Sequence, residues 1–251
     1  MRVKKRLGQH FLRNREILKE IVQAAELSKK DAVLEVGPGT GELTEFLAGA
    51  SGKVIAVEKD SGLIPPLRSK FKPHKNVKII EGDILQISKS KFLISKQIPK
   101  SKYKIVANIP YYITSRFLRN VLEARNKPKL MVLMVQYEVA KRICARPPEM
   151  NLLALSVQAY GRPKLLRKVS KGSFAPPPEV DSAVIKISDI SDDRFRQNKI
   201  NPEKFFDILR RAFQQKRKML RHSLKNLKLP EKYFKKRPQE LSLEDWFEIL
   251  N

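Results

Sequence analysis

The stretch Glu35-Val-Gly37-Pro-Gly39-Thr-Gly41-Glu42-Leu-Thr44 decides the fold of this chain. It completes the apolar run 32–36 and opens an amphipathic segment, so we expect a buried strand to pass into a helix here. Glycines at the junction permit a tight turn and let the backbone approach a ligand closely. A strand, a glycine-rich turn and a helix in this order indicate a nucleotide-binding α/β domain.

Short apolar runs and longer amphipathic segments alternate on both sides of this turn. The runs are rich in β-branched residues, as buried parallel strands are, and fall at 32–36, 53–57, 77–80, 103–107 and 130–135. Helices are expected between them at 42–49, 62–71, 114–123 and 138–145. Two later runs, 164–169 and 182–187, are expected as strands near the edge of the sheet. The alternation predicts an α/β fold with a mostly parallel, seven-stranded sheet covered by helices on both faces.

The composition changes at 188–198, a polar stretch without periodicity that we interpret as a linker. A helix start follows, with Asn201 as the N-cap, Pro202 at the first helical position and Glu203 in the first turn. The predicted organisation is therefore an α/β domain over residues 1–190 and a small, basic, all-α domain over residues 191–251.

The glycine pattern limits the ligand that the turn can bind. A dinucleotide fingerprint requires Gly-x-Gly-x-x-Gly, but the sixth position counted from Gly37 is Glu42. A carboxylate at the start of the helix disfavours a pyrophosphate, which would otherwise bind there. The pattern suits a nucleoside cofactor that is not an anion at this point, such as S-adenosylmethionine, whose sulfonium is positive.

Acidic residues follow the next two expected strands. Glu58 lies about 20 residues after Gly37, where an acid commonly binds ribose hydroxyls. Asp83 follows a glycine and can accept a hydrogen bond from an adenine amino group. Because ligands bind at the carboxyl ends of strands in open α/β sheets, these features predict one cofactor site. Its predicted residues include Gly37, Gly39, Glu58, Asp83 and Ile84.

The fourth expected strand ends in Asn108-Ile-Pro110-Tyr111, which places an amide, a rigid turn and an aromatic ring at the same edge. This combination fits methyl transfer to an amino nitrogen conjugated to a ring, whose delocalised lone pair is a poor nucleophile. Acceptors for its two N–H groups, the Asn108 side chain and a backbone carbonyl held by Pro110, would draw the nitrogen towards tetrahedral geometry. Tyr111 could stack on the ring. Alignment and carbonyl dipoles would lower the barrier without a strong base.

A second aromatic segment, Phe174-Ala-Pro-Pro-Pro-Glu-Val-Asp-Ser-Ala183, begins with a stiff, extended run of prolines. We expect Phe174 to close the other face of an extruded base, as base-flipping enzymes require. The alternative is that Phe174 anchors its loop in the core. For Tyr112, packing against the core is a credible interpretation. The predicted catalytic residues are Asn108, Pro110, Tyr111 and Phe174.

Together these motifs resemble the ribosomal RNA adenine dimethylase family, which includes the small-subunit rRNA dimethyltransferases and the erythromycin-resistance methyltransferases. The resemblance also rests on Leu7-Gly-Gln-His10-Phe-Leu12 and Gln136-Tyr-Glu-Val-Ala-Lys-Arg142, and it covers nearly all of the first 190 residues. It implies a Rossmann-like class I S-adenosylmethionine-dependent methyltransferase domain. It also implies that the cofactor pocket contains His10, Leu12, Gly37, Glu58, Asp83 and Asn108. The family usually carries Asn at the position of His10.

The resemblance also implies a reaction. The family's small-subunit members convert two adjacent adenines near the 3′ end of the rRNA to N6,N6-dimethyladenine. The opening segment and the proline-rich segment resemble that branch more closely. The alternatives are a large-subunit rRNA adenine methyltransferase of the erythromycin-resistance type, and a non-catalytic rRNA-binding assembly factor on the same scaffold. A nicotinamide-dependent oxidoreductase is disfavoured by Glu42.

The net charge of +26 favours a polyanionic partner. Between Arg210 and Arg237 there are 12 Lys or Arg and one acid, so pairing along a helix cannot explain the charge and phosphate binding is the better interpretation. We expect the partner to be small-subunit rRNA or a pre-30S-type ribosomal particle. The predicted RNA contacts are Lys4, Lys5, Arg6, Arg210, Arg211, Lys216, Arg217, Lys218 and Arg221, with residues 214–222 on one helix.

Cys144 is the only cysteine, and the three histidines lie far apart in the sequence. An internal disulfide is therefore excluded, and a metal site is not expected. No apolar run approaches the ~18 residues that span a bilayer, and the basic N-terminus lacks the apolar stretch of a secretory signal. We expect a cytoplasmic monomer that holds no metal and binds no membrane.

Overall fold

The structure, a computed structural model, describes residues 10–87 and 103–251. Its contacts divide the chain into two compact units, Met1–Ala140 with Lys164–Ile190, and Lys141–Pro163 with Ser191–Asn251. The second unit thus takes in Lys141–Pro163, which the sequence assigns to the first domain. The physical reason is aromatic packing, because the ring of Tyr160 lies 5.2 Å from that of Phe195 and 5.9 Å from that of Phe206.

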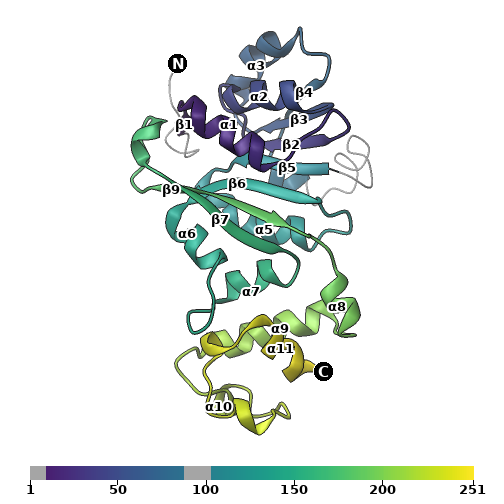
Figure 1. The fold of residues 1–251 in the computed structure, drawn as a ribbon, viewed down its shortest axis with the longest axis vertical. Coiled ribbons are helices and arrows are strands. Elements are labelled where there is room, and N and C mark those ends of the chain that lie inside the picture. The colour runs from purple at the N-terminus through teal and green to yellow at the C-terminus, as the bar shows by residue number, and fades with distance from the viewer. Residues whose placement is uncertain (1–9, 88–102) are drawn as a thin grey trace. The chain divides into compact units, whose positions relative to one another are not determined.

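Within the described residues, seven strands form one sheet in the order β4-β3-β2-β5-β6-β9-β7 (Figure 1). Neighbouring strands from β4 to β6 are parallel, and β9 is antiparallel to β6. The expected, mostly parallel α/β fold is therefore confirmed. The strands are β2 (Ala32–Val36), β3 (Lys53–Glu58), β4 (Val77–Glu81), β5 (Tyr103–Asn108), β6 (Leu130–Gln136), β7 (Arg162–Val169) and β9 (Ser182–Ser188).

Helices follow the strands where the sequence predicts them, in α2 (Glu42–Ala50), α3 (Ile64–Phe71), α5 (Thr114–Leu122) and α6 (Tyr137–Ile143). A 3₁₀ turn, η2 (Ser61–Leu63), precedes α3. Of the described helices before residue 190, three were not predicted: α1 (Arg15–Ala24), the short α4 (Ile84–Ile87) and α7 (Leu152–Gln158). Asn14 starts α1, because its side chain accepts hydrogen bonds from the first free backbone N–H groups of the helix.

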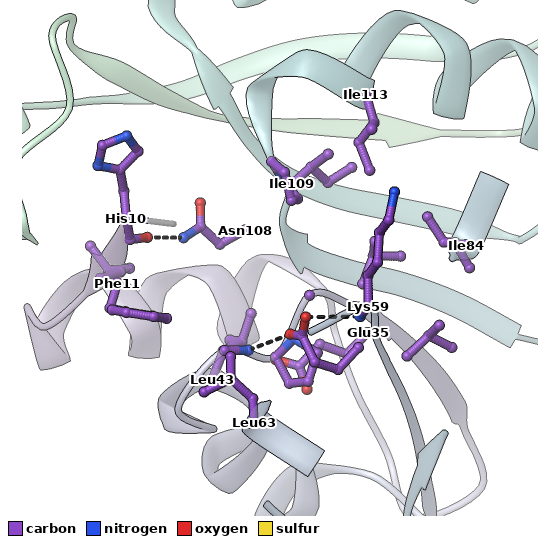
Figure 2. Close-up of a pocket in the computed structure, with 18 of the residues that line it drawn as sticks. His10, Phe11, Glu35, Leu43, Lys59, Leu63, Ile84, Asn108, Ile109 and Ile113 are labelled. Atoms are coloured by element: carbon purple, nitrogen blue, oxygen red, sulfur yellow. Dashed lines mark hydrogen bonds between the residues drawn. The ribbon is translucent and has the colours of Figure 1, made fainter. Parts of the chain in front are cut away.

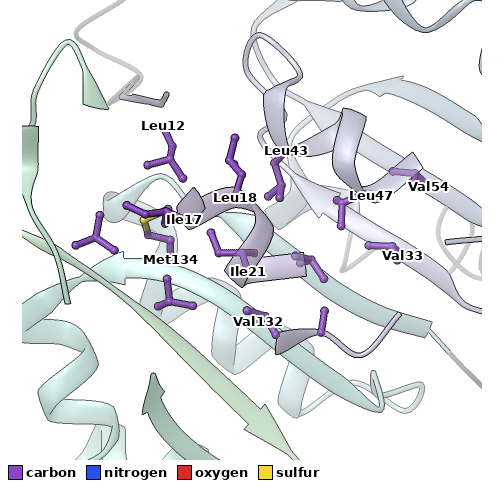
Figure 3. Close-up of a cluster of buried hydrophobic side chains, with 14 of the residues drawn as sticks. Leu12, Ile17, Leu18, Ile21, Val33, Leu43, Leu47, Val54, Val132 and Met134 are labelled. Carbon is purple, nitrogen blue, oxygen red and sulfur yellow. The ribbon is translucent and has the colours of Figure 1, made fainter. Parts of the chain in front are cut away.

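Apolar side chains from α1, α2 and the sheet form a core on one face (Figure 3). Ile21 of α1 and Leu47 of α2 are fully buried against strand residues that include Val132 and Met134. Alternate strand residues point to opposite faces, and Leu133 between these two is also fully buried. Both faces of the sheet are therefore covered, as the unbroken apolar strands require.

A small second sheet pairs β1 (Phe11–Leu12) with β8 (Phe174–Ala175) in antiparallel fashion. Leu12 lies opposite Phe174, and both side chains are buried, with 3% and 5% of their surface exposed. The pairing attaches the start of the described chain to the proline-rich segment.

The second unit is helical and contains α7 (Leu152–Gln158), α8 (Asp193–Gln197), α9 (Pro202–Gln214), α10 (Leu220–Ser223) and α11 (Leu243–Leu250). Its core is aromatic: Phe195 packs edge-on to Phe205, and Phe205 stacks on Phe247 at 5.1 Å. Trp246 is fully buried in α11. Within residues 10–87 and 103–251, no helix has both the length and the apolar character that crossing a bilayer requires.

Two expectations for this unit are wrong. The stretch 188–198 is more than a linker, because it contains α8 and buries Phe195 to 2% exposure. The segment 214–222 is not one helix, because α9 ends at Gln214 and α10 begins at Leu220. Lys216, Arg217 and Lys218 consequently lie in an exposed turn between the two helices.

Asn201→Ala should lower the free energy of unfolding by about 1 kcal/mol. The Asn201 side chain accepts hydrogen bonds from the backbone N–H groups of Glu203 at 2.8 Å and Lys204 at 3.2 Å, as the sequence predicts for a cap of α9. Asn201→Asp keeps an acceptor and should keep most of the stability. Urea unfolding followed by the fluorescence of the single tryptophan, Trp246, measures both variants. An equal loss in the two would contradict the capping role.

Candidate active site

A pocket lies at the carboxyl edge of the sheet, where the ends of parallel strands meet (Figure 2). β2 delivers the glycine-rich turn, β3 ends at Glu58, β4 is followed by Asp83, and β5 ends at Asn108. The residues that line it and were predicted for the site are His10, Leu12, Gly37, Gly39, Glu58, Asp83, Ile84, Asn108, Pro110 and Tyr111. The structure thus gathers groups that are far apart in sequence around one cavity.

The glycine-rich turn depends on backbone conformations that other residues rarely adopt. Gly39 has φ +62° and Gly41 has φ +86°. A Cβ at Gly39 would approach the Phe11 ring to 2.8 Å, and a Cβ at Gly41 would approach the Phe71 ring to 2.6 Å. Close packing and left-handed backbone therefore require glycine at both positions.

Glu58 holds the turn in place from the neighbouring strand. Its carboxylate accepts hydrogen bonds from the backbone N–H groups of Gly39 at 3.2 Å, and of Lys59 and Asp60 at 2.8 Å each. Burial raises the pKa of Glu58 above its ordinary value, although these N–H donors act in the opposite direction. Glu58 is thus a nearly buried acceptor at the wall of the pocket.

Asp83 stands at the end of the next strand and contacts Lys59. The Lys59 ammonium donates to one carboxylate oxygen at 2.9 Å, and the backbone N–H of Leu85 donates to the other at 2.9 Å. Partial burial raises the pKa of Asp83, but these two hydrogen bonds outweigh it and the net pKa is below its usual value. Asp83 is therefore an ionised acceptor, and Lys59 is a pocket residue that the sequence did not single out.

Glu35 lies on the floor of the pocket with 1% of its surface exposed. Thr44 Oγ1, which is also buried, donates to its carboxylate at 2.6 Å. Burial, together with the neighbouring charges of Glu58 and Glu42, raises the pKa of Glu35 to about 8. Glu35 therefore holds a proton near neutral pH, and the carboxylates of Glu42, Glu58 and Asp83 in the same cavity are the groups that favour a cationic ligand over a phosphate.

Asn108 is held by the segment that β1 brings to the pocket. Its side-chain nitrogen donates to the backbone carbonyl of His10 at 3.2 Å, which leaves the amide oxygen outside that bond (Figure 2). His10 in turn contacts the carbonyl of Pro176 through Nδ1 at 3.0 Å. The main chain of His10 therefore makes this contact, and its side chain reaches the proline-rich segment instead.

The aromatic side chains of Tyr111, Tyr112 and Phe174 differ in exposure. Tyr111 is part-buried beside His10, with ring centroids 6.0 Å apart and planes 20° from parallel. Tyr112 lines the pocket and is 59% exposed, contrary to core packing. Phe174 is 5% exposed, belongs to the core beside Leu12 and does not line the pocket. The expectation that Phe174 closes a base-binding slot is not supported here, because its pairing in β8 buries the ring.

The predicted RNA contacts within the described residues do not line this pocket. Arg210 and Arg211 lie on the exposed side of α9, and Lys216, Arg217, Lys218 and Arg221 are exposed near its end. Arg210 makes a long ion pair with Asp207 at 3.8 Å. Lys4, Lys5 and Arg6 lie outside the described residues.

The strand order and the acid-lined, glycine-rich edge define a class I S-adenosylmethionine-dependent methyltransferase fold. The family model for ribosomal RNA adenine dimethylase matches residues 1–244, and the chain belongs to this family. The expectations for family and fold are therefore confirmed.

Individual relatives agree. The chain is 48% identical to ribosomal RNA small subunit methyltransferase A of Dehalococcoides mccartyi, over 89% of this chain and 75% of the relative. It is 37% identical to the Clostridium botulinum protein of that name, over 96% and 90%. Among solved structures, a dimethyladenosine transferase from Plasmodium falciparum matches with TM-score 0.80 at 27% identity, and 23S rRNA methyltransferase ErmE with TM-score 0.73 at 25% identity. The first alignment covers 96% of both chains, and the second covers 96% of this chain and 99% of ErmE.

Glu35→Gln should change how stability depends on pH. With a pKa raised from 4.5 to about 8, the folded protein keeps a proton that the unfolded chain releases, so stability falls as pH rises between these values. Glutamine cannot ionise and can still accept from Thr44, so this loss should be absent. Relative to the unsubstituted protein, the variant should gain stability from about pH 5 to about pH 8. Denaturant unfolding at several pH values tests this, with the exposed Glu149→Gln as a control; parallel pH curves for Glu35→Gln would contradict it.

Proposed function

We propose that the protein is an S-adenosylmethionine-dependent rRNA adenine dimethyltransferase, which converts two adjacent adenines near the 3′ end of small-subunit rRNA to N6,N6-dimethyladenine. The observation that carries the proposal is that Asn108 shares one pocket with Glu58 and Asp83. An amine acceptor and a nucleoside cofactor would therefore meet at the same edge of the sheet. The high identity to a small-subunit methyltransferase favours this substrate over large-subunit RNA. The reaction would belong to small-subunit biogenesis.

The donor set of the pocket fits the cofactor. Glu58 and Asp83 offer carboxylate acceptors for ribose hydroxyls and for an adenine amino group. Glu42, in the first turn of α2, places negative charge where a pyrophosphate would bind. When bound, S-adenosylmethionine supplies a methyl group on a positively charged sulfur. The acidic surroundings suit that charge.

The residues at the end of β5 would prepare the acceptor amine. Asn108 Oδ1 would accept one N–H of the adenine amino group, since the side-chain nitrogen is fixed by His10. The carbonyl of Ile109, which precedes the rigid Pro110, would accept the other. The backbone N–H of Ile109 donates to the carbonyl of Met134 at 3.2 Å, so the peptide group that precedes the Ile109 carbonyl is tied to β6. These two acceptors would localise the nitrogen lone pair, and the product would release its extra proton to water.

The exposed cations of the second unit would bind the RNA backbone. Phosphate contacts of this kind position a substrate and carry no sequence information. Choice of adenine would come from the Asn108 pocket and from the shape of the RNA. This division supports the proposal that residues 191–251 serve RNA binding and that the α/β domain carries catalysis.

Two other functions can be separated from this one. Methyl labelling of large-subunit RNA, without labelling of undermodified small subunits, would indicate an enzyme of the erythromycin-resistance type. The structural likeness to ErmE is the reason to test this alternative. If a catalytically dead protein fulfils the whole cellular role, the chain is an assembly factor.

Asn108→Ala should reduce methyl transfer to small-subunit rRNA on the order of 100-fold or more, because one acceptor for the amine is lost. Affinity for S-adenosylmethionine, measured by calorimetry, should change much less. The surface variant Asn226→Ala is a matched control, because Asn226 is exposed in the second unit. An unchanged rate in Asn108→Ala would contradict the proposed role of the amide.

Neutralising Lys216, Arg217 and Lys218 should weaken RNA binding and reduce its salt dependence by about 0.7–0.9 in logarithmic slope per lost phosphate contact. Affinity for S-adenosylmethionine should stay unchanged. A triple variant of Lys72, Lys75 and Lys78, which are exposed in the first unit, removes the same charge and should alter the slope less. Equal slopes for both triple variants would show that only total charge matters.

A further inference from the structure

A hydrogen bond joins the two motifs on the acceptor side of the pocket. Tyr111 Oη and Ser182 Oγ lie 2.6 Å apart, although 71 positions separate them in the chain. Tyr111 begins the 3₁₀ turn η3 (Tyr111–Ile113) directly after Pro110, and Ser182 closes the proline-rich segment where β9 begins. Nothing in the proposed reaction so far uses Ser182.

Ser182 is a rigid point of attachment. Its side chain is fully buried, and its backbone lies opposite Gln136 in the β6–β9 ladder. The carbonyl of the preceding residue, Asp181, accepts a hydrogen bond from the backbone N–H of Tyr137 at 2.9 Å. The Ser182 hydroxyl is therefore fixed to the interior of the sheet.

Tyr111, in contrast, stands on a short turn. A tyrosine on such a turn can rotate about two side-chain torsions, and nothing in a three-residue 3₁₀ turn restricts the second. Here the turn fixes the base of the side chain, His10 lies beside the ring, and Ser182 holds the hydroxyl end. The direction of the ring is consequently defined at both ends.

The orientation of the Tyr111 ring matters for methyl transfer. A ring that stacks on the acceptor base sets the angle at which the amino nitrogen meets the methyl group, and small errors of alignment are costly in rate. Burial raises the pKa of Tyr111, so its phenol stays protonated and serves as a hydrogen-bonding handle, with no role as a base.

We propose that Ser182 is a positioning residue for methyl transfer, which fixes the Tyr111 ring against the acceptor adenine through their hydrogen bond. The inference rests on the proposed function and extends it to a residue that does not line the pocket. It also gives the Ser of the proline-rich segment a function besides strand pairing.

A double-mutant cycle tests it. Ser182→Ala and Tyr111→Phe remove the two ends of the bond, and both variants and their combination are assayed for methyl transfer with undermodified small subunits. Each single variant should lower kcat about 5-fold or more, while KM for the particle and the dissociation constant of S-adenosylmethionine stay nearly constant. The double variant should lose no more than either single variant, because the two hydroxyls act as one unit.

Two controls remove the same groups elsewhere. Ser51 is a fully buried serine whose hydroxyl donates to the carbonyl of Leu47, and Tyr103 is a buried tyrosine whose hydroxyl donates to the carbonyl of Asn126. Ser51→Ala and Tyr103→Phe should lower the melting temperature about as much as the test variants but leave kcat unchanged. Losses of kcat that follow melting temperature in all four variants would overturn the proposal, as would independent, multiplying effects in the cycle. An unsubstituted protein without activity on these particles would instead overturn the proposed function.

Discussion

The pocket depends on one buried carboxylate, that of Glu58. It receives backbone N–H groups from the glycine-rich turn after β2 and from its own loop after β3, and so joins two separate connections into one wall. A carboxylate has about four acceptor positions, and three are filled here by the protein. About one is left for a ligand, so a ribose that offers two hydroxyls would have to share an oxygen with a loop N–H. The same Glu58 carboxylate would thus hold both the glycine-rich turn and a bound ribose, so the conformation of the turn and ligand binding would depend on each other.

This coupling explains why the turn tolerates so little variation. Left-handed backbone at Gly39 brings its N–H to Glu58, and the same glycine lets Phe11 of β1 pack over the turn. β1 in turn places the His10 carbonyl against Asn108. One chain of contacts therefore runs from Glu58, the proposed ribose acceptor, to the amide that would hold the acceptor amine.

The sequence predicted the main sheet well, since buried parallel strands are unbroken apolar runs with few alternative interpretations. It could not predict β1 and β8, because two-residue strands have no periodicity. The helix α8 was not predicted because only one side chain of this polar segment, that of Phe195, is buried, and one apolar residue gives no helical periodicity. Lys216 was expected on a helix because apolar residues on both sides of it, from Phe205 to Leu224, fit one helical face, yet α9 ends at Gln214 and α10 begins only at Leu220. At the site, the sequence spacing of the motifs identified the acids and Asn108. The burial of Phe174 depends on the pairing of β8 with β1, and the hydrogen bond from Tyr111 to Ser182 joins distant segments, so only the folded structure shows them.

The charge of the protein now divides into two opposing parts. The excess of +26 would draw RNA to the whole surface, and exposed cations of the second unit have few acids near them in sequence. The pocket carries the opposite sign, with the carboxylates of Glu42, Glu58 and Asp83 around one cavity, while Glu35 in the same cavity keeps its proton up to about pH 8. A phosphate is repelled there, whereas a neutral base can enter and a cationic cofactor is favoured. The acids thus keep the RNA backbone out of the one place that its bases must reach, so attraction can be strong without blocking the site.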